Sequence, residues 1–304
     1  MINQLKRHVE NLHKCYVSAE NEAGFIREDE KEALRRKQER LRSSKAEIVK
    51  NIVDGRIITE RSIEGKTIID YGIKMQNVIR RGKQLHIEEQ VQVRRAVTEG
   101  GKIIDDYVLY REGVGEGENE EGERNGSPYL PFEGTRRSSP AYSYDRLAVV
   151  RYAERWWNDY NPAYKVFENN CTNYVSQCLM AGGAPMWGIP QRTKGWWYRN
   201  NNWSFSWSVA HALRWYLSGA KEGLQAIEVE RPEDLLNGDL ICYDFNGDGR
   251  WQHTTVVTAK DEENMPLVNA QTTNSRMRYW AYEDSTAWTP EIKYKFFHII
   301  DRDF

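Results

Sequence analysis

Two residues in this chain of 304 have the types and the order that nucleophilic catalysis requires. Cys171 lies in the polar segment Asn-Asn-Cys-Thr-Asn-Tyr-Val-Ser-Gln, and His253 follows in the second half of the chain. Between them, the Gly238-Asp239 step begins a strand-like run. A thiol becomes a strong nucleophile when a base removes its proton, and that base comes from elsewhere in the fold. The pair therefore predicts a cysteine hydrolase.

The position of Cys171 suits this role. Asn170 is predicted to be a helix N-cap, which places Cys171 in the first turn of a helix. The free N–H groups and the helix dipole there favour a thiolate and can hold an oxyanion. Cys178 shares a helix face with Cys171 but lies deeper, so we interpret it as core. The alternative is that Cys171 is itself a small buried apolar residue.

His253 competes with two other histidines after Cys171. His211 lies in a helical stretch between Cys171 and the Gly-Asp step, and His298 lies in an apolar terminal strand. A lone histidine is more often structural than catalytic. His253 is preferred as the base because it alone follows the Gly-Asp step and begins the next strand.

Longer motifs around these residues resemble the bacterial "putative amidase domain" family. The resemblance extends from about Tyr144 to the C-terminus. It rests on 160–164, 170–177, 181–183, Gly238-Asp239, Tyr243-Asp244, Asp248-Gly249, His253 and 272–274. The family is similar to the NlpC and CHAP classes of papain-like cell-wall hydrolases. The resemblance implies a papain-like α+β domain with a Cys-His-polar site that hydrolyses an amide bond.

The chain departs from the family pattern at two positions. Asn170 stands where the family usually has Asp, and Gln271 stands where it commonly has His. A third polar residue holds the base imidazole in the correct tautomer. If residues 267–271 form a strand, Asn269 and Gln271 point to the same face and either could orient His253. Gln271 is favoured by its position.

Five residues are predicted to contact the substrate. Two of them are in a loop, 193–206, in which aromatic and amide side chains alternate, as in grooves that bind sugars or peptides. The alternative is that these rings brace the loop against the body of the protein. The predicted substrate contacts are Asn170, Asn173, Trp196, Trp197 and Asn269.

The segment before His253 could bind calcium. Asp244, Asn246 and Asp248 fit the opening D-x-N-x-D-G of a calcium loop. Position 12 of such a loop would be Thr255, which cannot supply the bidentate carboxylate. The segment is therefore not an EF-hand, and the alternative is a polar hairpin turn. No cofactor is required by the predicted chemistry.

Composition excludes several classes. The net charge is −2, which gives no global basic field for nucleic acid. The mean hydropathy is −0.78, and no run approaches the ~18 apolar residues of a membrane span. The N-terminus lacks the apolar core of a signal peptide, so four reduced cysteines and a cytoplasmic location are expected. Oligomeric state is left open.

The chain is expected to form two domains. Residues 113–141 are rich in Gly, Glu, Ser and Pro and predict a mobile linker. Residues 1–112 predict two helices followed by four strand-like runs, 56–63, 67–80, 84–98 and 103–111, that form an antiparallel meander. This smaller α+β domain precedes the hydrolase domain, 142–304.

The expected function is amide hydrolysis through a thioester, with a peptide or a peptidoglycan fragment as the substrate implied by the resemblance. Two alternatives from other classes remain. One is an inactive module that binds peptides or glycans on the same fold. The other is an acyltransferase, which passes the thioester to an amine.

Overall fold

The computed structural model describes residues 2–17, 26–109 and 142–301. These residues form two compact units. The first contains residues 1–112 and 273–288, and the second contains residues 113–272 and 289–304. Residues 273–288 were expected in the C-terminal domain and instead belong to the first unit. The predicted linker, 113–141, lies entirely within residues 110–141, outside the described part of the chain.

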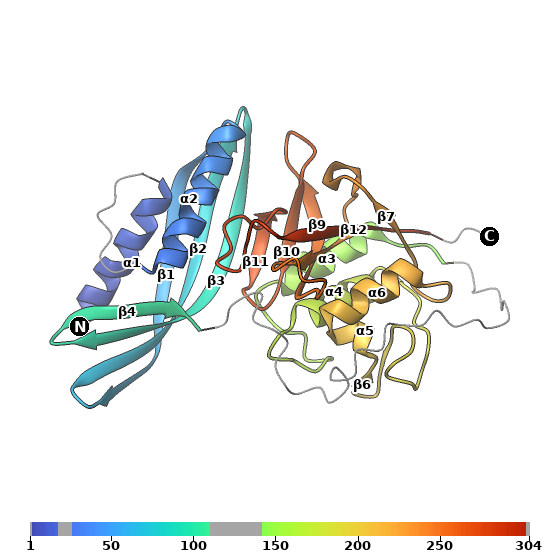
Figure 1. Ribbon diagram of the computed structural model, residues 1–304, viewed down its shortest axis with the longest axis horizontal. Helices are drawn as coiled ribbons and strands as arrows, with labels where there is room; N and C mark the ends of the chain where they lie inside the picture. The colour runs from blue at the N-terminus through green and yellow to red at the C-terminus, as the bar shows by residue number, and fades with distance from the viewer. Residues whose placement is uncertain (1, 18–25, 110–141, 302–304) are drawn as a thin grey trace. The chain divides into compact units, whose positions relative to one another are not determined.

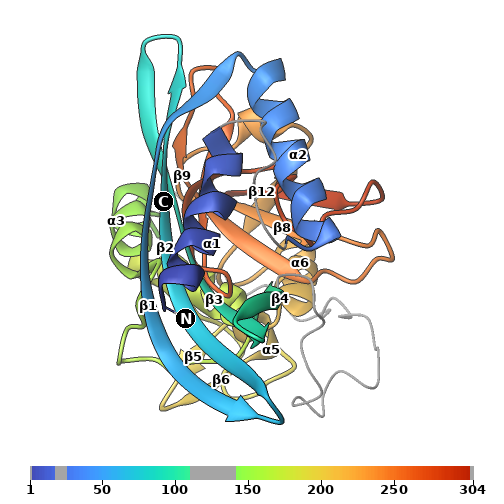
Figure 2. The same cartoon turned by 90° about the vertical axis from the view of Figure 1, so that its left-hand side faces the viewer.

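The first unit places two helices on one face of a curved antiparallel sheet (Figures 1 and 2). The sheet order is β1-β2-β3-β11, and β4 also pairs with β3, so β1 to β4 form the expected meander. The elements are α1 (Ile2–Val17), α2 (Glu28–Ser43), β1 (Ala46–Ile63), β2 (Lys66–Arg81), β3 (Gln84–Glu99), β4 (Lys102–Val108) and β11 (Ser275–Tyr279).

Alternating side chains of β2 make the core of this unit. Every second residue of β2 is buried on the same face of the sheet, including Ile69, Tyr71, Ile73 and Met75. Leu5 and Val9 of α1 pack against these side chains in one hydrophobic cluster. The predicted strand 56–63 begins ten residues earlier, at Ala46, because the charged helix ends at Ser43. Glu64 and Gly65, both at positive φ, form the two-residue turn between β1 and β2.

The second unit also combines helices with an antiparallel sheet, in the order β10-β9-β8-β12-β7. Its helices are α3 (Arg146–Trp156), α4 (Cys171–Ala181), α5 (Phe205–Ser208), α6 (Ala210–Gly219) and the 3₁₀ turn η1 (Pro232–Asp234). Its strands are β5 (Tyr198–Arg199), β6 (Asn202–Trp203), β7 (Ala226–Val229), β8 (Leu240–Asp244), β9 (His253–Lys260), β10 (Pro266–Ala270) and β12 (Lys293–Ile299). The mixed α/β composition and the antiparallel sheets agree with the expected class.

The Gly-Asp step before β8 is a structural junction of this unit. Gly238 adopts a φ of 90° and donates its N–H to Val257 of β9. The buried carboxylate of Asp239 accepts hydrogen bonds from the Ile299 N–H and from Arg146 Nη1, and bonds His298 Nδ1 at 2.8 Å. The step therefore fixes β8 between β9 and β12.

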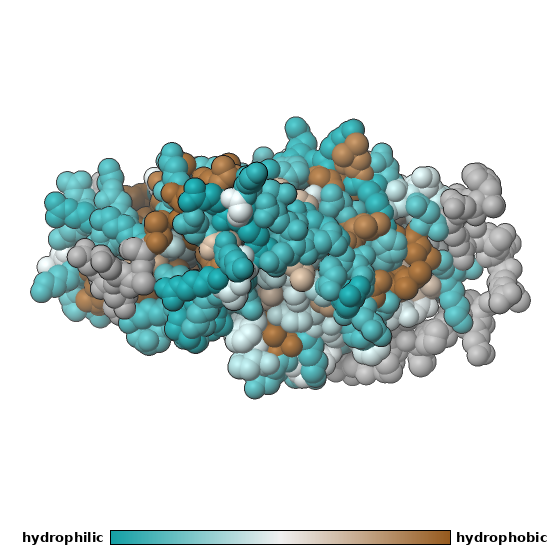
Figure 3. All heavy atoms as spheres, turned by 90° about the horizontal axis from the view of Figure 1, so that it is seen from above, coloured by the Kyte–Doolittle hydropathy of each residue, from teal (hydrophilic) through white to brown (hydrophobic). Residues whose placement is uncertain are grey.

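The surface seen in Figure 3 is predominantly hydrophilic, with apolar side chains in separate small patches. Among the described residues, the helices lack the length and apolar character needed to cross a bilayer.

Candidate functional site

Cys171 is the first residue of α4, as expected from the sequence. Asn170 occupies the N-cap position, but its side chain makes no capping hydrogen bond to the helix. Its Oδ1 instead accepts from the Phe167 N–H at 3.0 Å and from Asn173 Nδ2 at 2.9 Å. The predicted capping role of the Asn170 side chain is therefore wrong, although the position of the helix start is right.

The start of α4 lies against the start of β9. Cys171 Sγ is 3.7 Å from Thr172 Oγ1, and Thr172 Oγ1 is 3.5 Å from Thr254 Oγ1, the residue after His253. Cys242 of β8 pairs with Thr254 in the sheet. Burial raises the pKa of Cys242 to about 12, and the nearby charge of Cys171 adds to this effect. Cys171, Thr254 and Cys242 therefore share one buried region on the helix-covered face of the sheet.

His253 is the first residue of β9 and is buried. The centroid of its imidazole is 5.6 Å from the ring of Tyr243, in β8, and 6.2 Å from the ring of Phe245, directly after β8. The residue after it, Thr254, contacts Thr172 of α4. The structure therefore brings the chain segments of Cys171 and His253 together. The role of His253 as base stays a prediction.

The contacts of Gln271 differ from the expected ones. Its Nε2 donates to the carbonyl oxygens of Trp156 at 2.6 Å and Asp159 at 2.8 Å, and its Oε1 accepts from Asn170 Nδ2. Both ends of the Gln271 amide therefore form hydrogen bonds with groups other than the His253 imidazole. The side chain connects the segment before Cys171 to the end of α3, and a role of Gln271 in orienting His253 stays a prediction.

Asn269 lies on the same face of β10 as Gln271. Its Nδ2 donates to Glu154 Oε1 at 2.9 Å, and its Oδ1 accepts from Thr258 Oγ1 at 3.0 Å. These bonds connect the sheet to α3. Its predicted contact with substrate stays a prediction.

Trp196 and Trp197 do not line an open groove. They are 0% and 1% exposed. Trp196 Nε1 donates to Ser176 Oγ of α4 at 2.9 Å, and Trp197 Nε1 donates to the backbone oxygens of Gln191 and Lys194. Trp196 therefore holds the loop against α4 and Trp197 holds the loop to itself, while their predicted role in substrate binding stays a prediction.

Asn173 is likewise committed to the fold. Its Nδ2 donates to Lys165 O and to Asn170 Oδ1, both at 2.9 Å, and its Oδ1 accepts from Trp207 Nε1 at 2.8 Å. Because these bonds use the amide donor and acceptor in a buried site, Asn173 holds the loop that leads into α4. The predicted contact of Asn173 with substrate stays a prediction.

The loop after β8 fits calcium in part. Asp244 is fully buried, and its Oδ1 has no hydrogen-bond partner among the described residues. The other predicted carboxylate is engaged, because Asp248 Oδ1 accepts from the Arg250 N–H at 2.8 Å. Asn246 is exposed. The described part of the chain contains no cluster of three or more His, Cys, Asp or Glu arranged to hold a metal ion. Calcium binding at Asp244, Asn246 and Asp248 stays a prediction.

Three threonines connect the site and were not predicted to do so. Thr172 and Thr254 join α4 to β9, and Thr272 Oγ1 accepts from the Asn170 N–H at 3.1 Å. All three directly follow a predicted catalytic residue in the sequence, namely Cys171, His253 and Gln271. Their position next to a predicted catalytic residue could have identified them from the sequence. Thr172 and Thr254 each lie at the start of an element and face the neighbouring element.

Residues 143–297 match the family described as "Putative amidase domain". The chain is 47% identical over 272 residues to the uncharacterized protein YhbB of Bacillus subtilis (strain 168), covering 88% of this chain and 86% of that protein. It is 30% identical over 140 residues to the uncharacterized protein YjcM of the same strain, covering 43% and 31%. No solved structure matches. The family match supports a general amidase, and hence hydrolase, activity.

Proposed function

We propose that this chain, which belongs to the "Putative amidase domain" family, is a cysteine-dependent amidase with Cys171 as nucleophile and His253 as base. The observation that carries the proposal is the contact between Thr172 and Thr254. It supports the proposal because it sets the first turn of a buried helix, beginning with a thiol, against the first residues of the strand that begins with an imidazole.

The proposed chemistry runs through a thioester. His253 takes the proton of the Cys171 thiol, and the sulfur attacks the carbonyl carbon of the amide. The oxyanion that forms is held by N–H groups in the first turn of α4, which the Asn170 side chain leaves uncapped. The imidazolium then gives its proton to the leaving amine, the C–N bond breaks, and water hydrolyses the thioester.

His253 acts as the base from the beginning of β9, where its ring packs beside the Tyr243 and Phe245 rings. Catalytic hydrogen bonds often tighten only when substrate is bound. The expected substrate is the amide bond of a peptide, and a peptidoglycan peptide is the specific proposal.

A second candidate is a binding module without turnover on the same fold. It is favoured by the burial of Cys171, which is 2% exposed, because a substrate carbonyl must reach the sulfur. It is also favoured by Gln271, whose amide is occupied by Asn170 and two backbone carbonyls. An acyltransferase would use the same thioester and differ in its acceptor.

A hydrolysis screen decides between these candidates. The wild-type chain is incubated with peptidoglycan fragments and model peptide amides, with and without an added amine acceptor, and products are identified by mass spectrometry. An amidase releases a free carboxylic acid, and Cys171→Ala abolishes the release while His253→Gln lowers it at least about 100-fold. An acyltransferase transfers the acyl group to the amine. Binding of fragments with no product in any wild-type reaction would support the binding module and reject the proposal.

A further inference from the structure

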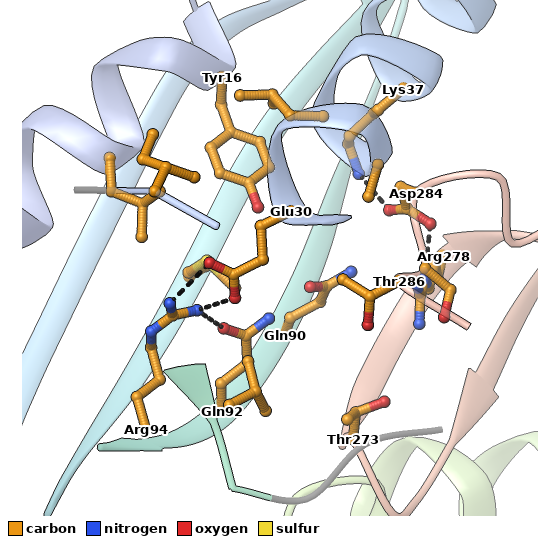
Figure 4. A pocket seen from close by; sticks show the side chains of 17 residues that line it. Tyr16, Glu30, Lys37, Gln90, Gln92, Arg94, Thr273, Arg278, Asp284 and Thr286 are labelled. Atoms are coloured by element: carbon orange, nitrogen blue, oxygen red, sulfur yellow. Dashed lines mark hydrogen bonds and ion pairs between the residues drawn. The ribbon is translucent and has the colours of Figure 1, made fainter. Parts of the chain in front are cut away.

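The first unit contains a pocket whose lining includes none of the residues proposed for amide hydrolysis. It is bounded by α1, α2, β2, β3, β4 and the segment 273–286, and its cavity volume is about 70 Å³. Figure 4 shows the labelled side chains converging on this space from the helices, from β3 and from the segment that carries Asp284.

The charged groups of the wall neutralise one another. Arg94 holds Glu30 through two nitrogen–oxygen contacts of 2.9 Å. Asp284 is held by Lys37 at 2.8 Å and by Arg278 at 2.9 Å. Lys37 also donates to Glu88, and Arg94 also contacts Asp106 at 3.0 Å. An ionic ligand would have to break a buried pair and leave a charge without its partner, which is costly. The pocket therefore favours an uncharged ligand.

Neutral polar groups of the wall keep hydrogen-bonding capacity. Gln90 and Gln92 are two residues apart on β3 and so project from the same face into the pocket. Gln92 Oε1 accepts from Arg94 Nη1 at 3.1 Å, which leaves its Nε2 for a ligand. Within 2–17, 26–109 and 142–301, the side chains of Gln90, Tyr16 and Thr286 make no hydrogen bond. A primary amide can donate to and accept from another amide in a paired arrangement.

The remaining wall is apolar. It is lined by Leu12 of α1, by Ile26 just before α2, by Ala33 and Leu34 of α2, by Met75 of β2 and by Val108 of β4. A ligand that satisfies both walls has an amide group on one side and a hydrocarbon group on the other. We propose that this pocket binds an uncharged ligand that carries a secondary or primary amide beside an apolar group, with Gln90 as the amide-recognising residue.

The same chemistry occurs in capped peptides and in N-acetylated sugars, so the experiment has two arms. The full chain with Cys171→Ala, which prevents turnover, is titrated with N-acetyl-leucinamide in one arm and N-acetylglucosamine in the other. Binding is followed by calorimetry and by the NMR signals of the glutamine side-chain amides. N-acetyl-leucine, which is an anion at neutral pH, and leucinamide, which is a cation, are the charged controls for N-acetyl-leucinamide. The arm that binds identifies the source of the ligand.

Gln90→Met tests the assigned residue, since it keeps the side-chain length and removes the hydrogen bonds. We expect its Kd for the neutral amide to rise about tenfold or more. Gln84→Met, at an exposed position of the same strand, should leave the Kd unchanged. If Gln90→Met lowers the melting temperature, Thr286→Val replaces it with the same expectation. The proposal is overturned if neither neutral amide binds at tens of millimolar, if the charged counterparts bind as tightly, or if the pocket variants do not change the Kd.

Discussion

The side chains of Asn170 and Gln271, 101 positions apart in the chain, are joined by a buried hydrogen bond from Asn170 Nδ2 to Gln271 Oε1. The resemblance implies Asp and His at these two positions, where this chain has two neutral amides. Because the two side chains are bonded to each other, we expect substitutions at the two positions to be coupled. Gln271 cannot simply flip, because its Nε2 already donates to Trp156 O and Asp159 O.

Restoring one partner alone should destabilise the second unit. Asn170→Asp places a carboxylate oxygen against the Gln271 carbonyl oxygen in a buried site, and we expect a loss of about 3 kcal/mol in the free energy of unfolding. Adding Gln271→His should recover at least half of this loss, since a protonated imidazole can donate to the introduced carboxylate and to a backbone carbonyl. Urea unfolding of the two single variants and the double variant gives the coupling energy. Additive effects would contradict the paired interpretation.

The four cysteines should differ sharply in their reactivity. Burial raises the pKa of Cys242 to about 12 and that of Cys178 well above its ordinary range, which removes their thiolates at neutral pH. Cys171 lies at the start of a helix, where a thiolate is favoured. Iodoacetamide at pH 7 should therefore alkylate Cys171 well before Cys178 and Cys242, as peptide mass spectrometry would show.

The control for this labelling is the unfolded chain. In urea, all four cysteines should react at similar rates, because the differences come from the fold. His253→Gln should slow the labelling of Cys171 in the folded chain if the imidazole supports the thiolate. Equal labelling of Cys171, Cys178 and Cys242 in the folded protein would reject Cys171 as the nucleophile.

The buried ion pairs of the first unit should make Lys37 essential for its stability. Lys37 is almost fully buried and bonds both Glu88 and Asp284. Burial works against the charged form of Asp284, but Arg278 and Lys37 lower its pKa well below the usual range. Lys37→Met leaves two buried carboxylates short of a partner, so we expect a loss of about 3–5 kcal/mol.

Lys31→Met is the matched control on the same helix. Lys31 pairs with Glu28 at 2.6 Å on the exposed side of α2, and such pairs contribute about 0–1 kcal/mol. Hydrogen exchange of the β3 amides reports on this unit directly. Equal exchange rates in the two variants would show that the buried network adds nothing to stability.

Local signals predicted the elements well and the side-chain partners poorly. The glycine-punctuated runs predicted β2, β3 and β4, and the polar Asn-Asn step predicted the start of α4 at Cys171. Whether Gln271 reaches His253 or Asn170 depends on the register of β9 and β10 and on where α3 ends. The residues next to Gln271 in the sequence determine neither the strand register nor the end of α3.

Long-range packing also determines contacts that sequence reasoning did not predict. Trp196 and Trp197 occur in an amide-rich loop, as groove residues do, but Ser176 of α4 and the loop backbone take their N–H groups. Residues 273–288 follow the predicted active-site strand directly, yet β11 pairs with β3 of the first unit. A sequence pattern contains no information on which distant strand edge is open to receive such a segment.

His13 should make the first unit sensitive to mild acid. Its ring stacks on Tyr16 at 5.5 Å, and both ring nitrogens are buried without a hydrogen-bond partner among the described residues. Burial, with smaller effects from the charges of Arg94 and His8, lowers the pKa of His13 to about 3. The imidazole is therefore neutral in the folded unit at pH values where it is protonated in the unfolded chain.

The sign of the effect follows from this depressed pKa. The unfolded state binds the proton first as the pH falls below about 6.5, so stability is complete above that pH and decreases toward pH 3. Between pH 7 and pH 5 we expect a loss of about 2 kcal/mol that His13→Phe removes. The buried carboxylates Asp106 and Asp284 also have lowered pKa values, but they act below about pH 4 and do not enter this window. His86→Gln, in β3, is the control and should keep the wild-type slope. Hydrogen exchange of β2 at pH 7 and pH 5, corrected for intrinsic rates, measures the change, and an unchanged slope in His13→Phe would show that another group titrates.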